Sequence, residues 1–490
     1  METEQYLEVR SSANLVVLEG ENITNYSLQI KNSWEIGRKV TGNNKDIELN
    51  SMIVSRNHGT ITNVDGKWYF TECGSKNGTY YNGTKVAAKA IELKNGDVLR
   101  IDSADINNPD DRGVWMLFTT ETMGNRWKII ELSKEHTTFG RSEECDVVFP
   151  IPYISACHMG IKKHCGRYFV TDYDSKAGTW LNNMSVHGYM ELKEKDMICI
   201  CNCIMIFTQN KIIYNIPEQK KIENSDDIRT VILKADIKSR KVPDKSGHGF
   251  KELIRNVKVE VEEGTLVALL GGAGAGKSTV MNCMNGMDTS GMEGTVLFKG
   301  VDLLKQFDRM KYLIGGVPQF EIFHETLTVE QELTHAARLR LPGDMKKSEI
   351  EDRVTYTLKQ LGIESIRKNK ISKCSGGERK RVNIGIELVA DRQLLCMDEP
   401  DAGLDPGNKR KLFELLRKLA HEEQKTILAI IHDVSDIELF DKVIIMNKVD
   451  NIGRLAFNGT PKEAKEYFNA DIKDIYTIMA NNPEKYIYRS

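Results

Sequence analysis

Residues 264–284 read "GTLVALLGGAGAGKSTVMNCM" and predict the architecture of the C-terminal half of the chain. The apolar start, 266–270, has the composition of a buried strand, and a glycine-rich loop leads from it into a helical segment. A strand, a GxxxxGKS loop and a helix in that order predict a phosphate-binding loop. Glycine suits such a loop because backbone N–H groups can then close around phosphate oxygens without interference from Cβ atoms.

The side chains of this loop have separate expected tasks. We expect Lys277 to reach the β- and γ-phosphates of a nucleotide and Ser278 to offer its hydroxyl to Mg²⁺. The predicted nucleotide-binding residues of the loop are Gly271, Gly272, Ala273, Gly274, Ala275, Gly276, Lys277, Ser278 and Thr279.

A second expected strand, "QLLCMDEP" at 393–400, ends in two adjacent carboxylates. Asp398 suits the support of a metal ion, and Glu399 suits the polarisation of an attacking water. Paired acids on a surface loop are usually only solvated charges. Acids that directly follow a run of apolar strand residues are poorly placed for that role, so we favour a catalytic pair.

Further motifs follow in a fixed order: "GGVPQFEIF" at 315–323, "CSGGERKRVNIGIELV" at 374–389, "AGLD" at 402–405 and "AIIHD" at 429–433. With the glycine-rich loop, this set resembles the ABC ATPase family over about 229–468. The resemblance implies ATP as the nucleotide and a domain at 229–490. It also implies three catalytic residues, Gln319, Glu399 and His432. The residues expected to contact the nucleotide are Ser375, Gly376, Gly377, Asp398 and Asp405. The residues expected to bind Mg²⁺ are Ser278, Gln319 and Asp398.

Two segments, "TLTVEQELTHAARLRLP" at 326–342 and "GRLAFNGTPKEAKEYF" at 453–468, look most like the G subfamily, whose members usually fuse the ATPase to a membrane domain. We expect such a partner on a separate chain, or lost by truncation. By the same resemblance, Cys374 to Glu378 form the signature motif of the family, which departs from the commonest "LSGGQ" at its first and last residues. The resemblance makes Phe250 a candidate for stacking on adenine, and the alternative is that its ring only packs.

The N-terminal part contains an internal repeat. "SKNGTYYNG" at 75–83 returns as "SKAGTWLNN" at 175–183, and "SRNH" at 55–58 returns as "SACH" at 155–158. Short β-rich runs separated by Gly, Asn and Asp turns predict one antiparallel sandwich per repeat. The set resembles the forkhead-associated (FHA) domain, a phosphothreonine-reading β-sandwich, at 14–118 and 124–208. A polar linker is expected at 209–228.

The FHA resemblance implies that Arg38, Ser55, Arg56 and Asn77 contact a phosphopeptide in the first repeat. The second repeat keeps Arg141 and Ser155 but has Ala156 and Ala177 where the first has Arg56 and Asn77. Two donors are missing, one of them cationic, so we predict that only the first repeat reads phosphothreonine. The second is assigned a packing or protein-contact role against the ATPase.

Composition restricts the function further. Lys and Arg number 68 against 70 Asp and Glu, so no overall positive charge favours nucleic acid. No secretory signal or membrane-spanning stretch is recognised, and the 10 cysteines lack a CxxC pair, which suits a reducing cytosol. Cys199, Cys201 and Cys203 alternate and are expected to be core thiols on one strand face.

These features predict an ATP-hydrolysing transporter subunit that works as a homodimer of ATPase domains. It would lie in the cytoplasm, at the inner face of a membrane through its partner, and be recruited by a threonine-phosphorylated protein. Two alternatives stay open: a soluble ABC ATPase without a role in transport, and a phospho-dependent scaffold.

Overall fold

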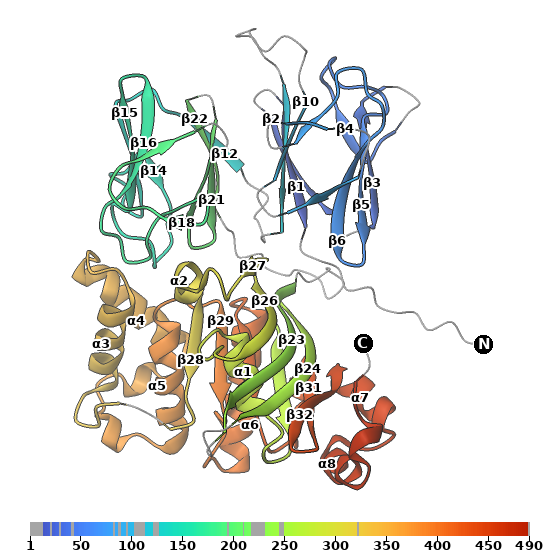
Figure 1. The fold of residues 1–490 in the computed structure, drawn as a ribbon. Helices are drawn as coiled ribbons and strands as arrows, with labels where there is room; N and C mark the ends of the chain where they lie inside the picture. Colours follow the sequence, from blue (N-terminus) through green and yellow to red (C-terminus); the bar gives the residue numbers. More distant parts are fainter. Residues whose placement is uncertain are drawn as a thin grey trace.

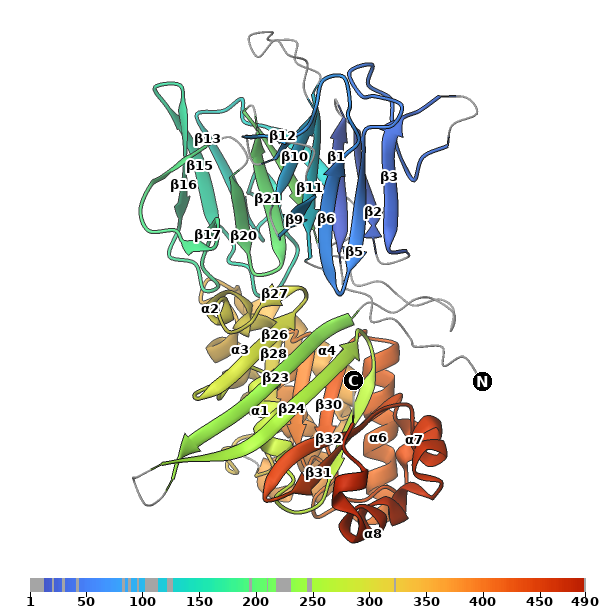
Figure 2. The ribbon, with the colours of Figure 1, turned by 45° about the vertical axis from the view of Figure 1, so that its right-hand side comes forward.

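The computed structural model describes residues 13–19, 22–28, 31–40, 44–81, 84–86, 90–94, 97–101, 113–120, 127–193, 196–208, 210–216, 231–244, 249–320 and 323–488. Two β-sandwiches lie side by side, and both stand on a larger α/β domain (Figures 1 and 2). The expected fold class, two all-β sandwiches followed by an α/β P-loop domain, is confirmed.

The first sandwich has a six-stranded sheet, β2-β1-β11-β10-β7-β8, and a five-stranded sheet, β4-β3-β5-β6-β9. Its inner faces meet over a core that includes Trp34, Phe70 and Phe118. The strands are β1 Asn14–Glu19, β2 Asn22–Ser27, β3 Ser33–Arg38, β4 Ile47–Leu49, β5 Gly59–Val64, β6 Lys67–Glu72, β7 Tyr80–Tyr81, β8 Thr84–Lys85, β9 Ile91–Leu93, β10 Val98–Ile101 and β11 Val114–Thr119.

The second sandwich repeats this plan, with sheets β12-β22-β21-β20-β17-β18 and β14-β13-β15-β16-β19. The strands are β12 Trp127–Glu131, β13 His136–Gly140, β14 Val147–Val148, β15 Met159–His164, β16 Arg167–Asp172, β17 Trp180–Leu181, β18 Met184–Ser185, β19 Met190–Leu192, β20 Met197–Ile200, β21 Cys203–Thr208 and β22 Lys211–Asn215.

The expected linker at 209–228 is wrong at its start. Strand β22 lies between β12 and β21 and pairs antiparallel with both. Polar composition hid this strand, because Lys211 and Asn215 flank a short buried pair, Ile212 and Ile213. Residues 209 and 217–228 of the expected linker lie outside the described residues.

The α/β domain has a ten-stranded sheet, β27-β26-β23-β24-β32-β31-β25-β30-β29-β28, in which β25, β28, β29 and β30 pair in parallel. Its strands are β23 Val231–Pro243, β24 Phe250–Glu262, β25 Leu266–Gly271, β26 Met292–Phe298, β27 Val301–Asp302, β28 Ile314–Val317, β29 Leu394–Asp398, β30 Thr426–Ile430, β31 Lys442–Val449 and β32 Ile452–Gly459.

Its helices are α1 Lys277–Met284, α2 Phe307–Met310, α3 Val329–Arg340, α4 Lys347–Leu361, α5 Gly376–Leu388, α6 Pro406–His421, α7 Pro461–Phe468 and α8 Ile472–Asn481. Helices α3, α4 and α5 pack on one another and form a helical layer beside β28, the last strand of the sheet (Figure 1). No helix in the described ranges is long and apolar enough to span a bilayer.

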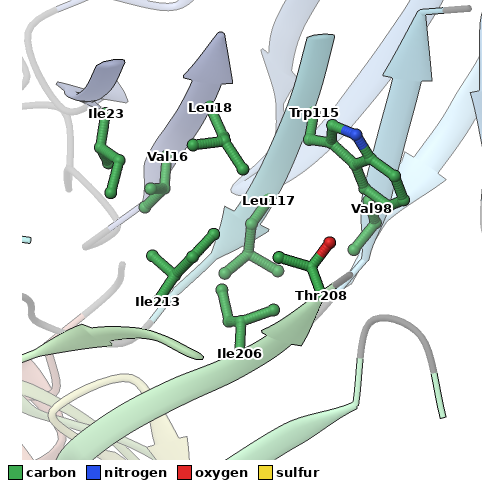
Figure 3. A pocket seen from close by; sticks show the side chains of 9 residues that line it. All are labelled: Val16, Leu18, Ile23, Val98, Trp115, Leu117, Ile206, Thr208 and Ile213. Carbon is green, nitrogen blue, oxygen red and sulfur yellow. The ribbon is translucent and has the colours of Figure 1, made fainter. Parts of the chain in front are cut away.

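The two sandwiches meet through apolar side chains of their six-stranded sheets. Figure 3 shows Val16, Leu117 and Trp115 of the first sandwich facing Ile206 and Ile213 of the second. Burial of this apolar surface is the force that holds the pair together.

The alternating cysteines do not share one face, which corrects that expectation. Cys199 belongs to β20 and packs in the cluster between the two sandwiches. Cys201 lies in a turn with φ of 50° and packs with Cys203 toward the α/β domain. All three are buried, as expected, and no metal-binding group of His, Cys, Asp or Glu occurs among the described residues.

The contact between the second sandwich and the α/β domain includes a buried cation. Arg309, at the end of α2, has 0% exposure and donates from Nε to the Cys201 carbonyl at 2.6 Å. In both ribbon views α2 lies beneath the second sandwich (Figures 1 and 2).

We predict that Arg309→Ala destabilises this contact by about 2–4 kcal/mol, because it removes a charge-assisted hydrogen bond and leaves a cavity and a buried carbonyl. Differential scanning calorimetry of the whole chain measures the change. The matched control is Lys311→Ala, which removes a charge from the adjoining turn, where Lys311 is 40% exposed and pairs with Asp308. A change below about 1 kcal/mol is expected for that exposed pair, and equal losses in both variants would contradict the role given to Arg309.

Candidate functional site

The glycine-rich loop connects β25 to α1 as the sequence predicts. Gly276 has φ of 86°, and a Cβ at that position would lie 2.6 Å from Ile254 Cγ2. Gly271 also has no space for a side chain, since a Cβ there would lie 2.7 Å from the Met446 carbonyl oxygen. Backbone conformation and space thus both require glycine at these two positions.

Lys277 begins α1 and bends back over the loop. Its Nζ donates to the carbonyl oxygens of Gly271 at 2.8 Å and Gly272 at 3.3 Å. Burial lowers the pKa of Lys277, and the carboxylates of Glu399 and Asp398 oppose that shift. The cation therefore lies next to the two acids, although 121 or more residues of sequence separate it from them.

Asp398 ends β29 with its side chain within hydrogen-bonding reach of Ser278. Burial raises the pKa of Asp398, the Glu399 carboxylate adds to the shift, and Lys277 and Ser278 oppose it. A carboxylate beside a hydroxyl is the oxygen-donor chemistry that Mg²⁺ prefers, so these residues fit the expected metal.

Glu399 is held from two sides. Gln319 Nε2 donates to Oε2 at 2.7 Å, and His432 Nε2 lies 2.7 Å from Oε1. Glu399 also has φ of 49°, a left-handed conformation that costs a non-glycine residue about 1–2 kcal/mol. Such strain is concentrated at functional sites, and here it directs the carboxylate toward both partners.

The signature residues lie apart from the acids, at the start of α5. Ser375 is the N-cap of this helix and forms a capping box with Glu378, so Glu378 has a structural role as well. Ser375 and Gly376 are exposed. The structure therefore presents the signature to solvent at a helix N-terminus, where backbone N–H groups attract anions.

Asp405 caps the next helix, α6, and accepts from the Asn408 backbone N–H at 3.1 Å. Hydrogen bonds from Asn408 lower the pKa of Asp405. Phe250 is 75% exposed at the start of β24, so it does not pack as the alternative expectation required.

Sequence reasoning missed several supporting residues. Lys380 on α5 donates to the Gln319 carbonyl at 3.2 Å. It so joins the helix that begins within the signature to the glutamine loop, the segment after β28 that carries Gln319. Lys409 pairs with Asp433 at 2.7 Å and Asp401 at 3.5 Å beside His432. Lys380 and Asp433 lie inside the quoted motifs but had no expected role, and Asp401 and Lys409 lie outside them. Only the fold brings these residues to the site.

In the first sandwich the four predicted phosphopeptide residues come from neighbouring loops. Arg38 ends β3, and Arg56 is exposed. Ser55 Oγ accepts a hydrogen bond from the Lys76 N–H at 2.9 Å. Asn77 donates a hydrogen bond to the Ile53 carbonyl at 2.7 Å. A buried histidine supports these loops. His58 Nδ1 accepts a hydrogen bond from the Ser55 N–H at 3.1 Å, and burial lowers the pKa of His58.

The second sandwich keeps the same support but lacks the same donors. His158 Nδ1 accepts from the Ser155 N–H at 3.2 Å, and its Nε2 lies 2.8 Å from Ser175 Oγ. Ala177 is buried and contributes no polar group. Gly37 and Gly140 occupy equivalent positions, where a Cβ would collide with the carbonyls of Arg56 and Ala156, respectively. The loop end of each sandwich, the end at which these predicted residues lie, therefore has the same backbone packing.

Models of two protein families match parts of the chain. A family model of the FHA domain matches residues 34–102 and 137–201, and a model described as ABC transporter matches residues 254–402. The "ABC transporter ATP-binding/permease protein Rv1747" of Mycobacterium tuberculosis is 29% identical over 358 residues, which are 72% of this chain and 39% of that protein.

Plant and animal relatives match the C-terminal part. ABC transporter G family member 26 of Arabidopsis thaliana is 31% identical over 53% of this chain and 37% of its own length. The broad substrate specificity ATP-binding cassette transporter ABCG2 of mouse is 34% identical over 44% of this chain and 33% of its own length. This chain thus spans well under half the length of these relatives.

Among solved structures, cbiO1 of Clostridium perfringens, part of the ABC transporter complex cbiONQ, aligns with a TM-score of 0.42 at 28% identity. The alignment covers 51% of this chain and 99% of that one.

We predict that Gly276→Ala lowers the stability of the α/β domain by about 1–2 kcal/mol or more and abolishes nucleotide binding, because the left-handed backbone and the contact with Ile254 both oppose a Cβ. Calorimetry and nucleotide titration measure the two effects. Gly272→Ala is the control for folding, since a Cβ there meets nothing within 4 Å. If Gly276→Ala is as stable as Gly272→Ala, the loop does not have the geometry described.

Proposed function

The chain combines two FHA domains with an ABC transporter ATPase domain, and we propose on that basis that it binds and hydrolyses ATP with Mg²⁺ to drive transport by a membrane partner. The observation that carries the proposal is the placement of Glu399 between Gln319 and His432, next to the loop that holds Lys277. A scaffold with an inactive ATPase would not need this arrangement, so the geometry favours hydrolysis.

The chemistry follows from the positions of these groups. Lys277 and the N–H groups of the loop bind the phosphates, and Mg²⁺ held by Ser278, Asp398 and Gln319 would neutralise their charge. Glu399 accepts a hydrogen bond from the attacking water and orients it toward the γ-phosphate. His432 and Gln319 keep the Glu399 carboxylate in place and contact the same phosphate region.

Hydrolysis requires two copies of the domain in this proposal. Gly272 to Gly274 of the loop and Ser375 of the signature are exposed, and they lie on different parts of one chain. A two-fold pairing would bring the Ser375, Gly376 and Gly377 donors of one copy onto the ATP of the other. Asp405, the N-cap of α6, would lie at the edge of that interface, and Phe250 would stack on adenine.

The first FHA domain supplies recognition. Arg38 and Arg56 are cationic donors and Asn77 is an amide donor, a set suited to the charge and three oxygens of phosphothreonine. We propose that a threonine-phosphorylated protein recruits or regulates the ATPase through this site. The chain would then lie at the cytoplasmic face of a membrane through its partner. A soluble ABC ATPase without a transport role is the second candidate, and detergent-dependent copurification with a multi-span protein distinguishes the two.

We predict that Glu399→Gln keeps ATP binding, loses at least about 100-fold in turnover, and accumulates as an ATP-bound dimer, because an amide accepts a proton poorly from water. Phosphate release and size-exclusion chromatography with multi-angle light scattering measure these effects. The control is Glu422→Gln, an exposed acid at the far end of α6. Parent-like turnover in Glu399→Gln would show that Glu399 does not have this role.

We also predict that Arg38→Ala weakens binding of a phosphothreonine peptide to the full chain about 10- to 150-fold, the loss of one charge-assisted hydrogen bond. Isothermal titration with matched phosphorylated and unmodified peptides measures it. Lys39→Ala removes a neighbouring exposed charge and serves as the control. Equal affinity in the Arg38→Ala and Lys39→Ala variants would contradict the phosphopeptide site.

A further inference from the structure

The loop end of the second sandwich, which carries Arg141, Ala156 and Lys176, is in contact with the ATPase domain. It faces the turn between α3 and α4, on the helical layer of the ATPase domain. Arg141, the counterpart of Arg38, is only 10% exposed. Its Nη1 pairs with Glu349 in the first turn of α4, and its Nη2 lies 3.7 Å from Asp344 Oδ1. A buried guanidinium therefore meets two carboxylates from the same turn.

Two further contacts come from the same loops. The Ala156 backbone N–H donates to Asp344 Oδ2 at 2.7 Å, and Lys176 Nζ donates to the Leu339 carbonyl at 2.9 Å. Ala156 and Lys176 are the counterparts of Arg56 and Lys76 in the first sandwich. Three loops that form the phosphopeptide end in one copy thus contact the chain itself in the other.

The first sandwich provides the comparison. Arg38 there donates to the Met52 carbonyl at 3.3 Å, and the exposed Arg56 stands where the second copy has the half-buried Ala156. The two loop ends have the same construction, so the difference lies in what covers them. In the second copy, the carboxylates lie where the first copy is expected to take a phosphate.

The Glu349 carboxylate is also fixed by a contact within its own helix. Glu349 Oε2 accepts from the Lys346 N–H at 2.7 Å and so caps α4, while Oε1 pairs with Arg141. One carboxylate therefore serves the helix and the sandwich together. A ligand fixed within the same chain needs few donors to stay bound, because its effective concentration is high, which explains why this site functions without Arg56 and Asn77 equivalents.

We propose that the loop end of the second FHA domain is an anion site whose ligands are two carboxylates of the same chain, those of Asp344 and Glu349. This occupancy closes the site to phosphothreonine. With Arg309 bound to the Cys201 carbonyl, it also fastens the sandwich to two parts of the ATPase domain, α2 and the helical layer. The packing of α3 and α4 on α5 connects the Arg141 contact to the signature. Only this connection to the signature rests on the proposed function.

Hydrogen–deuterium exchange of the full chain without nucleotide tests the site through a double-mutant cycle. The variants are Arg141→Ala, Glu349→Gln and the pair together; glutamine keeps the capping box and removes only the charge. We expect each single variant to raise exchange of the 341–350 amides about tenfold, and the pair to add less than about threefold, because both remove one interaction. Exchange in α6 serves as an internal reference for global unfolding.

Arg38→Ala and Glu351→Gln are the matched controls. Arg38 is the equivalent cation of the open site, and Glu351 is an acid two residues along α4 that pairs with Lys347. Less than about twofold change in 341–350 is expected from either. Unchanged exchange in the Arg141 and Glu349 variants, or an effect of the pair equal to the product of the singles, would overturn the proposal. Since no nucleotide is present, a failure of the ATPase assignment leaves this readout unaffected.

Discussion

The ATPase site depends on the parallel pairing of four adjacent strands, β25, β30, β29 and β28. The carboxyl ends of parallel strands meet at one edge of a sheet, where open α/β folds bind ligands. The loop of Lys277 follows β25, His432 follows β30, Glu399 follows β29 and Gln319 follows β28. The parallel pairing of these strands therefore brings together four side chains that are spread over 156 residues of sequence.

Hydrogen bonds then convert this proximity into a defined geometry. Glu399 could point in many directions, but its left-handed backbone and two partners at 2.7 Å hold the carboxylate in one. Lys380 extends the arrangement from Gln319 to α5 and so to the signature. The glutamine loop is thus in contact with both the acid and the helix that carries Ser375, which physically connects the two halves of the proposed composite site.

The duplicated sandwich illustrates how one scaffold can serve two purposes. Buried histidines and close-packed glycines recur at His58 and His158 and at Gly37 and Gly140, because both loop ends must be shaped in the same way. The exposed donors diverge, since their identity depends on the ligand. Loss of Arg56 and Asn77 equivalents accompanies burial of Arg141 against Asp344 and Glu349, so the second copy has become part of the architecture while the first remains open.

The sequence by itself determined the glycine-rich loop, the order of the ATPase motifs and the repeat, because each is encoded in short stretches whose local backbone needs are specific. Gly276 needs its left-handed φ, and Ser375 with Glu378 forms a local capping box. Tertiary structure alone decided that β22 completes the second sandwich, that Cys199 separates from Cys201 and Cys203, and that Arg141 meets Glu349 across 208 positions. Such contacts depend on how whole domains dock, and no periodicity or local motif specifies the surface that a distant segment will cover.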